Sequence, residues 1–121
     1  AADMVLGQED MVSKVAGVSA RNMDYPYFIA SNGTQVFLAE SNNNRVIFWD
    51  RFPTKDFTPA DGVLGQPDFD CNNNNENDGD CLTTGESTGP RGFDAPTGLL
   101  LTDNMLIVVD NNNNRAMVFR E

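Results

Sequence analysis

Two segments of this chain occur twice and in the same order, which constrains its fold more than any other feature. Residues 2–8 return as residues 60–66, and both copies contain Val-Leu-Gly-Gln. Residues 40–48 return as residues 110–118, and both copies carry an acidic residue, an asparagine run and an arginine. Motifs repeated in a fixed order indicate a repeated supersecondary unit. We therefore predict that one structural unit occurs twice.

The spacing of the motifs indicates how the two units differ. The first motif recurs after 58 positions, from position 8 to 66, and the second after 70 positions, from position 40 to 110. We place the first unit at residues 1–59 and the second at residues 60–121. The second unit is longer by the difference between these two offsets, and we place the insertion near residues 70–81.

Short apolar stretches separated by turn residues predict four antiparallel strands per unit. Asparagine and Asn-Gly tolerate left-handed backbone, so the asparagine runs and Asn32-Gly33 are predicted turns. The predicted strands are residues 27–30, 36–39, 45–49 and 63–65 in the first unit and 98–101, 105–109 and 115–119 in the second. Met11, Val15 and Val18 have helical spacing, which predicts a short helical turn in residues 11–18.

Several of the predicted strands are continuous apolar runs without alternation, for example residues 36–39 and 105–109. A strand reads this way when both of its faces are covered. Four short antiparallel strands, covered by a neighbour on each side, match the plan of a β-propeller blade.

Three segments carry a resemblance to a known family. These are Ala-Asp-Gly-Val-Leu-Gly-Gln-Pro-Asp-Phe at residues 60–69, Pro96-Thr97-Gly98, and Asp-Asn-Asn-Asn-Asn-Arg at residues 110–115. In this combination the chain resembles bacterial NHL-repeat proteins, and the resemblance covers essentially its whole length. It implies an all-β fold: two four-stranded antiparallel NHL-type β-propeller blades, part of a larger, commonly six-bladed propeller or assembly.

Composition excludes several functions. The chain has no histidine, which removes Ser–His and Cys–His nucleophile systems and histidine-containing zinc sites. Eighteen acidic against eight basic residues give a formal net charge of −10, which repels phosphate backbones and argues against nucleic-acid partners. No apolar stretch approaches the length of about 18–20 residues that a membrane helix needs, so we expect no membrane insertion.

The two cysteines, Cys71 and Cys81, flank a polar run in the insertion. Their spacing suits no zinc knuckle and favours a small disulfide-closed loop. An even number of cysteines in such surroundings favours an oxidising location, extracellular or periplasmic.

Oxygen donors recur within the same loop, at Asn74, Glu76, Asp78 and Asp80. The alternation at Asn74, Glu76 and Asp78, followed by Gly79, is similar to the first half of an EF-hand-type calcium loop. The acid expected at the twelfth position of such a loop falls on Gly85, one place before Glu86. Calcium is therefore one interpretation of these residues, and a solvated acidic loop closed by the disulfide is the other.

Other polar and aromatic residues have mainly structural interpretations. Arg45 and Arg115 are expected to form exposed ion pairs with Glu40 and Asp110 across the asparagine turns, or to bond turn carbonyls. Asn32-Gly33-Thr34 is an N-glycosylation sequon. Four aromatic residues are expected in the core rather than in a sugar-stacking platform. They are Trp49, Phe48, Phe119 and Tyr27.

Closed propellers have roughly four to eight blades, and this chain encodes two. We expect the missing cover to come from other copies of the chain or from further blades of a longer one. An additional fourth-strand segment would complete the last blade of a neighbouring copy, giving a homo-oligomeric ring or a filament. That assembly strand consists of Asp3, Met4, Val5, Leu6 and Gly7.

The sequence thus predicts a non-catalytic extracytoplasmic binding or structural module that self-assembles. The alternative is a carboxylate- and metal-dependent hydrolase or lactonase acting at the channel mouth. The predicted first strands, residues 27–30 and 98–101, contain no acidic residue, so we assign no catalytic residues.

Overall fold

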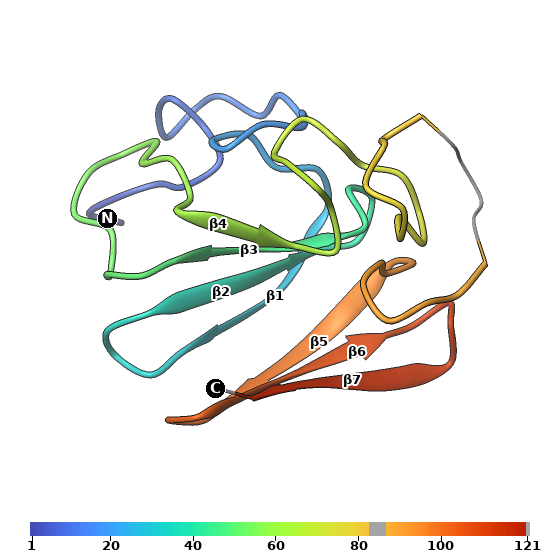
Figure 1. Cartoon of the computed structure of the whole chain (residues 1–121). Coiled ribbons are helices and arrows are strands. Elements are labelled where there is room, and N and C mark those ends of the chain that lie inside the picture. The colour runs from blue at the N-terminus through green and yellow to red at the C-terminus, as the bar shows by residue number, and fades with distance from the viewer. Residues whose placement is uncertain (83–86, 121) are drawn as a thin grey trace.

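The computed structural model describes residues 1–82 and 87–120, which fold into two antiparallel sheets without a helix (Figure 1). The prediction of an all-β chain is confirmed. The first sheet has the order β1-β2-β3-β4, and the second has the order β5-β6-β7. The strands are β1 (Pro26–Ser31), β2 (Val36–Glu40), β3 (Arg45–Trp49), β4 (Gly62–Leu64), β5 (Pro96–Leu101), β6 (Met105–Asp110) and β7 (Arg115–Arg120).

The turns of the first sheet arise from local side-chain hydrogen bonds. Asn32 Oδ1 accepts bonds from the backbone N–H groups of Thr34 and Gln35, and Gly33 has φ +92°. In the next turn Asn44 has φ 51°, a left-handed conformation that asparagine adopts more readily than most residues. Asn114 has φ 53° in the matching turn of the second sheet.

The two sheets repeat each other in register as well as in strand order. Pro26 pairs with Glu40, and the register then shifts at a bulge so that Phe28 pairs with Ala39. The second sheet has the same shift at the counterparts of these residues, where Pro96 pairs with Asp110 and Gly98 pairs with Val109. The sheets are therefore two copies of one meander.

Each sheet has two apolar faces. In the first sheet we call the face that carries Phe37 the front face and the opposite one the back face. Residues of the second sheet are assigned to the same faces as the residues 70 positions before them, as Asp110 corresponds to Glu40. The front face carries Phe37, Ala39, Val46 and Phe48 in the first sheet and Ile107, Val109, Ala116 and Val118 in the second. The back face carries Val36, Leu38, Ile47 and Trp49 in the first sheet and Leu106, Val108, Met117 and Phe119 in the second.

The main core lies between the sheets, where the front face of the first sheet packs against the back face of the second. Its centre includes Val46 and Val108, both fully buried, together with the buried ring of Phe93. The inner strands β1 and β5 of the two sheets lie near each other (Figure 1). This packing explains the continuous apolar run of residues 36–39, because the first sheet is covered on both faces.

The back face of the first sheet forms a second core with segments from outside the sheet. Trp49 and Ile47 are buried there, against Met23 and Ala60. Leu6 of the N-terminal segment packs on the same cluster.

The prediction of a helical turn in residues 11–18 is wrong. The side chains of Gln8 and Asp10, just before this segment, form hydrogen bonds with its backbone that hold it in a non-helical conformation. The side-chain amide of Gln8 donates to the Val15 carbonyl and accepts from the Val15 N–H. Asp10 accepts bonds from the N–H groups of Val12 and Ser13. Such bonds compete with helical ones, and Val15 is 69% exposed instead of packing on an apolar surface.

The fourth strand of the first sheet is observed at Gly62–Leu64, one residue before the predicted position. Gly65 follows with φ +91°, a conformation that ends the strand. In the described part of the chain, the second sheet has three strands, so the predicted number of four strands is observed in the first sheet only. The assignment of the sheets as propeller blades stays a prediction.

Matched hydrogen bonds locate the additional residues of the second unit. The Gly17 N–H donates to the Met23 carbonyl, and the Asn75 N–H donates to the Phe93 carbonyl. Gly17 and Asn75 differ by 58 positions, whereas Met23 and Phe93 differ by 70. The extra residues therefore lie between Asn75 and Phe93, a range that overlaps the end of residues 70–81.

Candidate assembly interface

The first asparagine hairpin encloses a buried ion pair. Arg45 Nε lies 2.6 Å from Glu40 Oε2, and both side chains are 0% exposed. Glu40 Oε1 also accepts bonds from the Asn43 side chain and the Asp24 N–H. The ion pair was expected from the sequence, but its predicted exposure is wrong because surrounding loops cover it.

Arg45 joins two separate loops through three backbone carbonyls. Nη1 donates to the Phe69 carbonyl at 2.7 Å, and Nη2 donates to the carbonyls of Ser19 and Asn22. Phe69 belongs to the second unit, so this arginine connects the two units. The guanidinium of arginine suits such a role because it presents several donors in a fixed fork.

The second hairpin repeats this network only in part. Arg115 Nε lies 2.7 Å from Asp110 Oδ2, and Nη2 donates to the Gly92 carbonyl. Within residues 1–82 and 87–120, no acceptor lies opposite Arg115 Nη1. Its side chain is 26% exposed, whereas that of Arg45 is fully buried. Among the described residues, no carbonyl takes the place beside Arg115 that the Phe69 carbonyl has beside Arg45.

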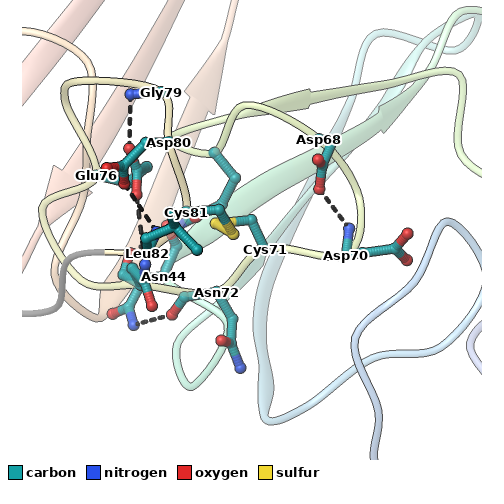
Figure 2. Close-up of a disulfide and its surroundings, with 12 residues drawn as sticks. Asn44, Asp68, Asp70, Cys71, Asn72, Glu76, Gly79, Asp80, Cys81 and Leu82 are labelled. Atoms are coloured by element: carbon teal, nitrogen blue, oxygen red, sulfur yellow. Dashed lines mark hydrogen bonds between the residues drawn. A yellow bond between two sulfur atoms is a disulfide. The ribbon is translucent and has the colours of Figure 1, made fainter.

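Asn44 is the main polar joint between the two units. Its Oδ1 accepts from the Ala95 N–H, and its side-chain amide donates to the Asn72 carbonyl, a bond drawn in Figure 2. Its backbone carbonyl accepts from the Gln66 side chain. Sequence reasoning treated Asn44 only as a turn former. The repeated glutamine of the Val-Leu-Gly-Gln motif is the sequence feature that could have indicated this joint.

Gly65 lies against the ring of Phe93. A Cβ atom at this glycine would be 2.3 Å from Phe93 Cδ2, so only glycine allows the close approach. The corresponding contact in the first unit joins Gly7 and Met23, where a Cβ would be 2.7 Å from Met23 Sδ. Gly7 also has a positive φ, +87°.

The N-terminal segment therefore lies on the first sheet much as the β4 segment lies on the second. Leu6 packs on the back-face core of the first sheet, and Leu64 packs on the core between the sheets. Residues 3–7, expected as an assembly strand, have no strand partner within the described chain. Val5 instead bonds to the loop before β4, through Asp56 and the Phe57 N–H.

The outer edge and front face of the second sheet are open. Val109 is 44% exposed and Val118 is 48% exposed, whereas their first-sheet counterparts Ala39 and Phe48 are buried and half-buried. Among the described residues, no strand pairs with β7 on the side away from β6. An exposed apolar edge strand of this kind is available for pairing with another strand.

Two cavities flank the outer part of β7, and Leu64 and Phe119 line both of them. The cavities have volumes of about 320 Å³ and 290 Å³. The first reaches towards the insertion loop through Glu76 and Arg91, and the second reaches the turn at Asp103. Apolar side chains of an additional strand could fill this space.

Cys71 and Cys81 form a disulfide, as the sequence predicted, with their Cα atoms 5.7 Å apart (Figure 2). Cys71 is 1% exposed and adjoins Asn72, the carbonyl of which accepts from Asn44. The disulfide therefore ties the insertion loop to the joint between the two units.

Three of the four candidate calcium ligands lie together. One carboxylate oxygen from each of Glu76, Asp78 and Asp80 falls within 4.8 Å of the others. Glu76 is buried and already accepts from the Gly79 N–H, and the two aspartates are exposed. Asn74 instead donates to Asp94 Oδ2.

Gly85 and Glu86, which bear on the twelfth ligand position of the predicted calcium loop, lie outside the described residues.

Hydrogen bonds in the N-terminal segment lower the pKa of Asp10. The backbone N–H of Val12 and then the side chain and backbone N–H of Ser13 hold the pKa of Asp10 below its ordinary value. Bonds donated to a carboxylate stabilise its charged form. In the second unit Asp68 accepts from the Asp70 N–H, so both units carry an Asp-centred turn after Val-Leu-Gly-Gln.

Asn32 is exposed on its turn. Trp49 is buried, and Phe48 and Phe119 are half-buried, as expected for core residues. Tyr27 contradicts the prediction: it is 55% exposed, and its ring centroid lies 6.0 Å from that of Tyr25. Tyr27 lies on β1, the first strand of its sheet, and among the described residues no strand pairs with the other edge of β1.

No protein-family model matches this chain, and no curated protein or solved structure is significantly similar to it. Within residues 1–82 and 87–120, no helix has the length and apolar character needed to cross a membrane.

Proposed function

We propose that this chain is a pair of NHL-type β-propeller blades that acts as a non-catalytic extracytoplasmic binding or structural module. Copies of the chain join by strand complementation, in which residues 3–7 of one copy complete the second sheet of another. The Cys71–Cys81 disulfide supports an extracellular or periplasmic location, because disulfides persist in oxidising compartments.

One relationship carries this proposal: the contact of Gly7 with Met23 matches the contact of Gly65 with Phe93. Gly65 follows β4, the outer strand of the first sheet, and this strand end lies on the second sheet. By the same relation, residues 3–7 have the position of an outer strand from a sheet preceding the first. Such a sequence of sheets, each lying on the next, is the arrangement of blades in a propeller.

The open front face of the second sheet supports the same conclusion. The front face of the first sheet is covered by the second sheet, and the matching face of the second sheet exposes Val109 and Val118. Soluble proteins rarely leave large apolar patches uncovered unless these surfaces bind something. Three copies would supply six blades in a closed ring, and a rotation that does not close would produce a filament.

Sedimentation velocity and native mass spectrometry of the purified chain test this function. We expect a defined trimer or a series of longer assemblies, and negative-stain electron microscopy then distinguishes discs from fibres. A stable monomer at concentrations of about 100 µM, well above typical transient affinities, would end the self-assembly proposal. Further blades of a longer chain would then be the partners of this surface.

A further inference from the structure

We propose that the groove beside β7 binds the segment from Met4 to Met11 of a second copy, in one defined register. This inference rests on the proposed self-assembly and specifies its partner segment. The register places Met4 opposite Val118, Val5 opposite Met117 and Leu6 opposite Ala116.

The first sheet supplies the template for this register. In it, β3 and β4 pair through Phe48 with Gly62, Ile47 with Val63 and Val46 with Leu64. The β3 residues correspond to β7 residues 70 positions later, and the β4 residues correspond to N-terminal residues 58 positions earlier. The groove therefore continues an interface that the chain already forms with its own Val-Leu-Gly segment.

Side-chain size supports Met4 as the partner of Val118. The Phe48 ring lies over Gly62, where an added Cβ would be 2.1 Å from Phe48 Cζ. A side chain as large as methionine cannot occupy that position beside phenylalanine. At the proposed pair both residues differ from their counterparts. Val118 stands at the position equivalent to Phe48, and Met4 stands at the position equivalent to Gly62. One large and one absent side chain are replaced by two of intermediate size, which conserves the filled volume.

The polar groups around the groove match the same partner. At the first asparagine hairpin the Gln66 amide donates to the Asn44 carbonyl, and Arg45 Nη1 donates to the Phe69 carbonyl. The corresponding groups in the second unit are the Asn114 carbonyl and Arg115 Nη1, and no described side chain bonds to either. Gln8 and the carbonyl of Met11 in the second copy are the equivalent partners, 58 positions before Gln66 and Phe69.

The cavities beside β7 accommodate the apolar part of this segment. Val63 packs into the back-face core of the first sheet beside Leu6. By the same relation, Val5 of the second copy enters the space lined by Leu64 and Phe119. Main-chain bonding along the strand then provides affinity, and the pockets provide specificity.

A compensating pair of substitutions tests the register. Val118→Phe recreates the large ring of Phe48 and clashes with Met4 of the second copy. We expect the dissociation constant, measured by sedimentation, to rise about ten- to hundred-fold, the range that overpacking produces. Adding Met4→Gly recreates the Phe48–Gly62 pair and restores association to within about threefold of wild type.

Met4→Gly alone is the matched control, and it weakens association because it leaves Val118 without its neighbour. Val118 is 48% exposed, so the substituted chains should fold, which thermal unfolding at low concentration verifies. If the wild-type chain assembles and the double variant does not recover, the register is wrong while self-assembly stands. If the wild-type chain remains monomeric, the self-assembly proposal itself fails.

Discussion

The guanidinium of Arg45 and the carboxylate of Glu40 form an ion pair with no solvent exposure, and Nε lies 2.6 Å from Oε2. Three backbone carbonyls from two loops accept hydrogen bonds from the other guanidinium nitrogens. A buried charge is tolerated when its partner and its remaining donors are satisfied in this way. The pair thus sits at the point where the loops of both units converge.

Removing one partner of this pair should therefore be costly. We expect Arg45→Ala to lower the free energy of unfolding by about 3–5 kcal/mol, because Glu40 would remain buried without its cation. Arg115→Ala is the matched control, since this arginine is partly exposed and makes fewer bonds. Urea denaturation of both variants below the assembly concentration measures the difference. Equal losses would show that the burial of Arg45 does not matter.

The contact between Gly65 and Phe93 provides a second prediction. Gly65→Ala places a methyl group against the buried ring and also imposes a left-handed conformation on alanine. Gly33→Ala is the control, because Gly33 has a similar φ of +92° and nothing within 4 Å of an added Cβ. We expect the free energy of unfolding to fall by about 1–2 kcal/mol in the control. In Gly65→Ala we expect it to fall by about 1–3 kcal/mol more. Thermal unfolding of both variants tests this, and similar melting temperatures would show that the close approach to Phe93 is unimportant for stability.

Loss of the disulfide should destabilise the insertion loop and the joint beside it. The cysteines are separated by 10 residues, and closing a loop of that size is worth about 2–3 kcal/mol. We expect the double variant Cys71→Ser with Cys81→Ser to unfold at correspondingly lower denaturant. Wild-type protein treated with reductant should match the variant. If reduction leaves the unfolding curve unchanged, the cross-link does not contribute to stability.

Calcium binding remains a sequence prediction for the insertion loop. The clustered oxygens of Glu76, Asp78 and Asp80 repel one another at neutral pH, and a divalent cation would offset this repulsion. Calorimetric titration should give a dissociation constant of about 10⁻⁴–10⁻³ M, the range of weak extracellular sites. Replacing both exposed aspartates with asparagine should remove the heat. If the wild-type chain gives no heat on titration with calcium, the other interpretation is favoured, a solvated acidic loop closed by the disulfide.

Asp10 should titrate at lower pH in the folded chain than in the unfolded chain. Its lowered pKa means that folding favours the charged carboxylate, through bonds from Val12 first and then Ser13. This contribution to stability is present above the unfolded pKa and is lost as the pH falls through the folded value. Carbon-13 NMR of the side-chain carboxyl gives the midpoint directly. A midpoint at or above the ordinary aspartate value of about 3.9 would contradict it.

Local sequence predicted most of the secondary structure. Val36–Glu40 and Arg45–Trp49 contain the predicted strands, and the turn between them forms because asparagine adopts the left-handed conformation at Asn44. The failed helix at residues 11–18 shows the limit of periodicity. Its apolar residues do have helical spacing, but hydrogen bonds with the side chains of Gln8 and Asp10 determine the backbone conformation instead.

The sequence predicts the candidate interface in outline only, and the interface stays a prediction. Residues 3–7 were expected to form an outer strand because of their likeness to residues 61–65. The joint formed by Asn44, Gln66 and Ala95 was not, because its members are far apart in the sequence and bond through backbone groups. Such contacts leave no periodic pattern in the sequence.

The sequence by itself determined the duplication, the all-β character and the turn positions, since each follows from local conformational preference or from repetition. It also indicated the cysteine pairing, because the chain has only two cysteines. Only the tertiary structure decided which polar groups are buried and which apolar faces stay open. Glu40 and Asp110 look alike in the sequence, yet the arginine paired with the first is enclosed and the arginine paired with the second is not. The reason is that burial depends on the neighbouring unit, which follows the first sheet and does not follow the second among the described residues.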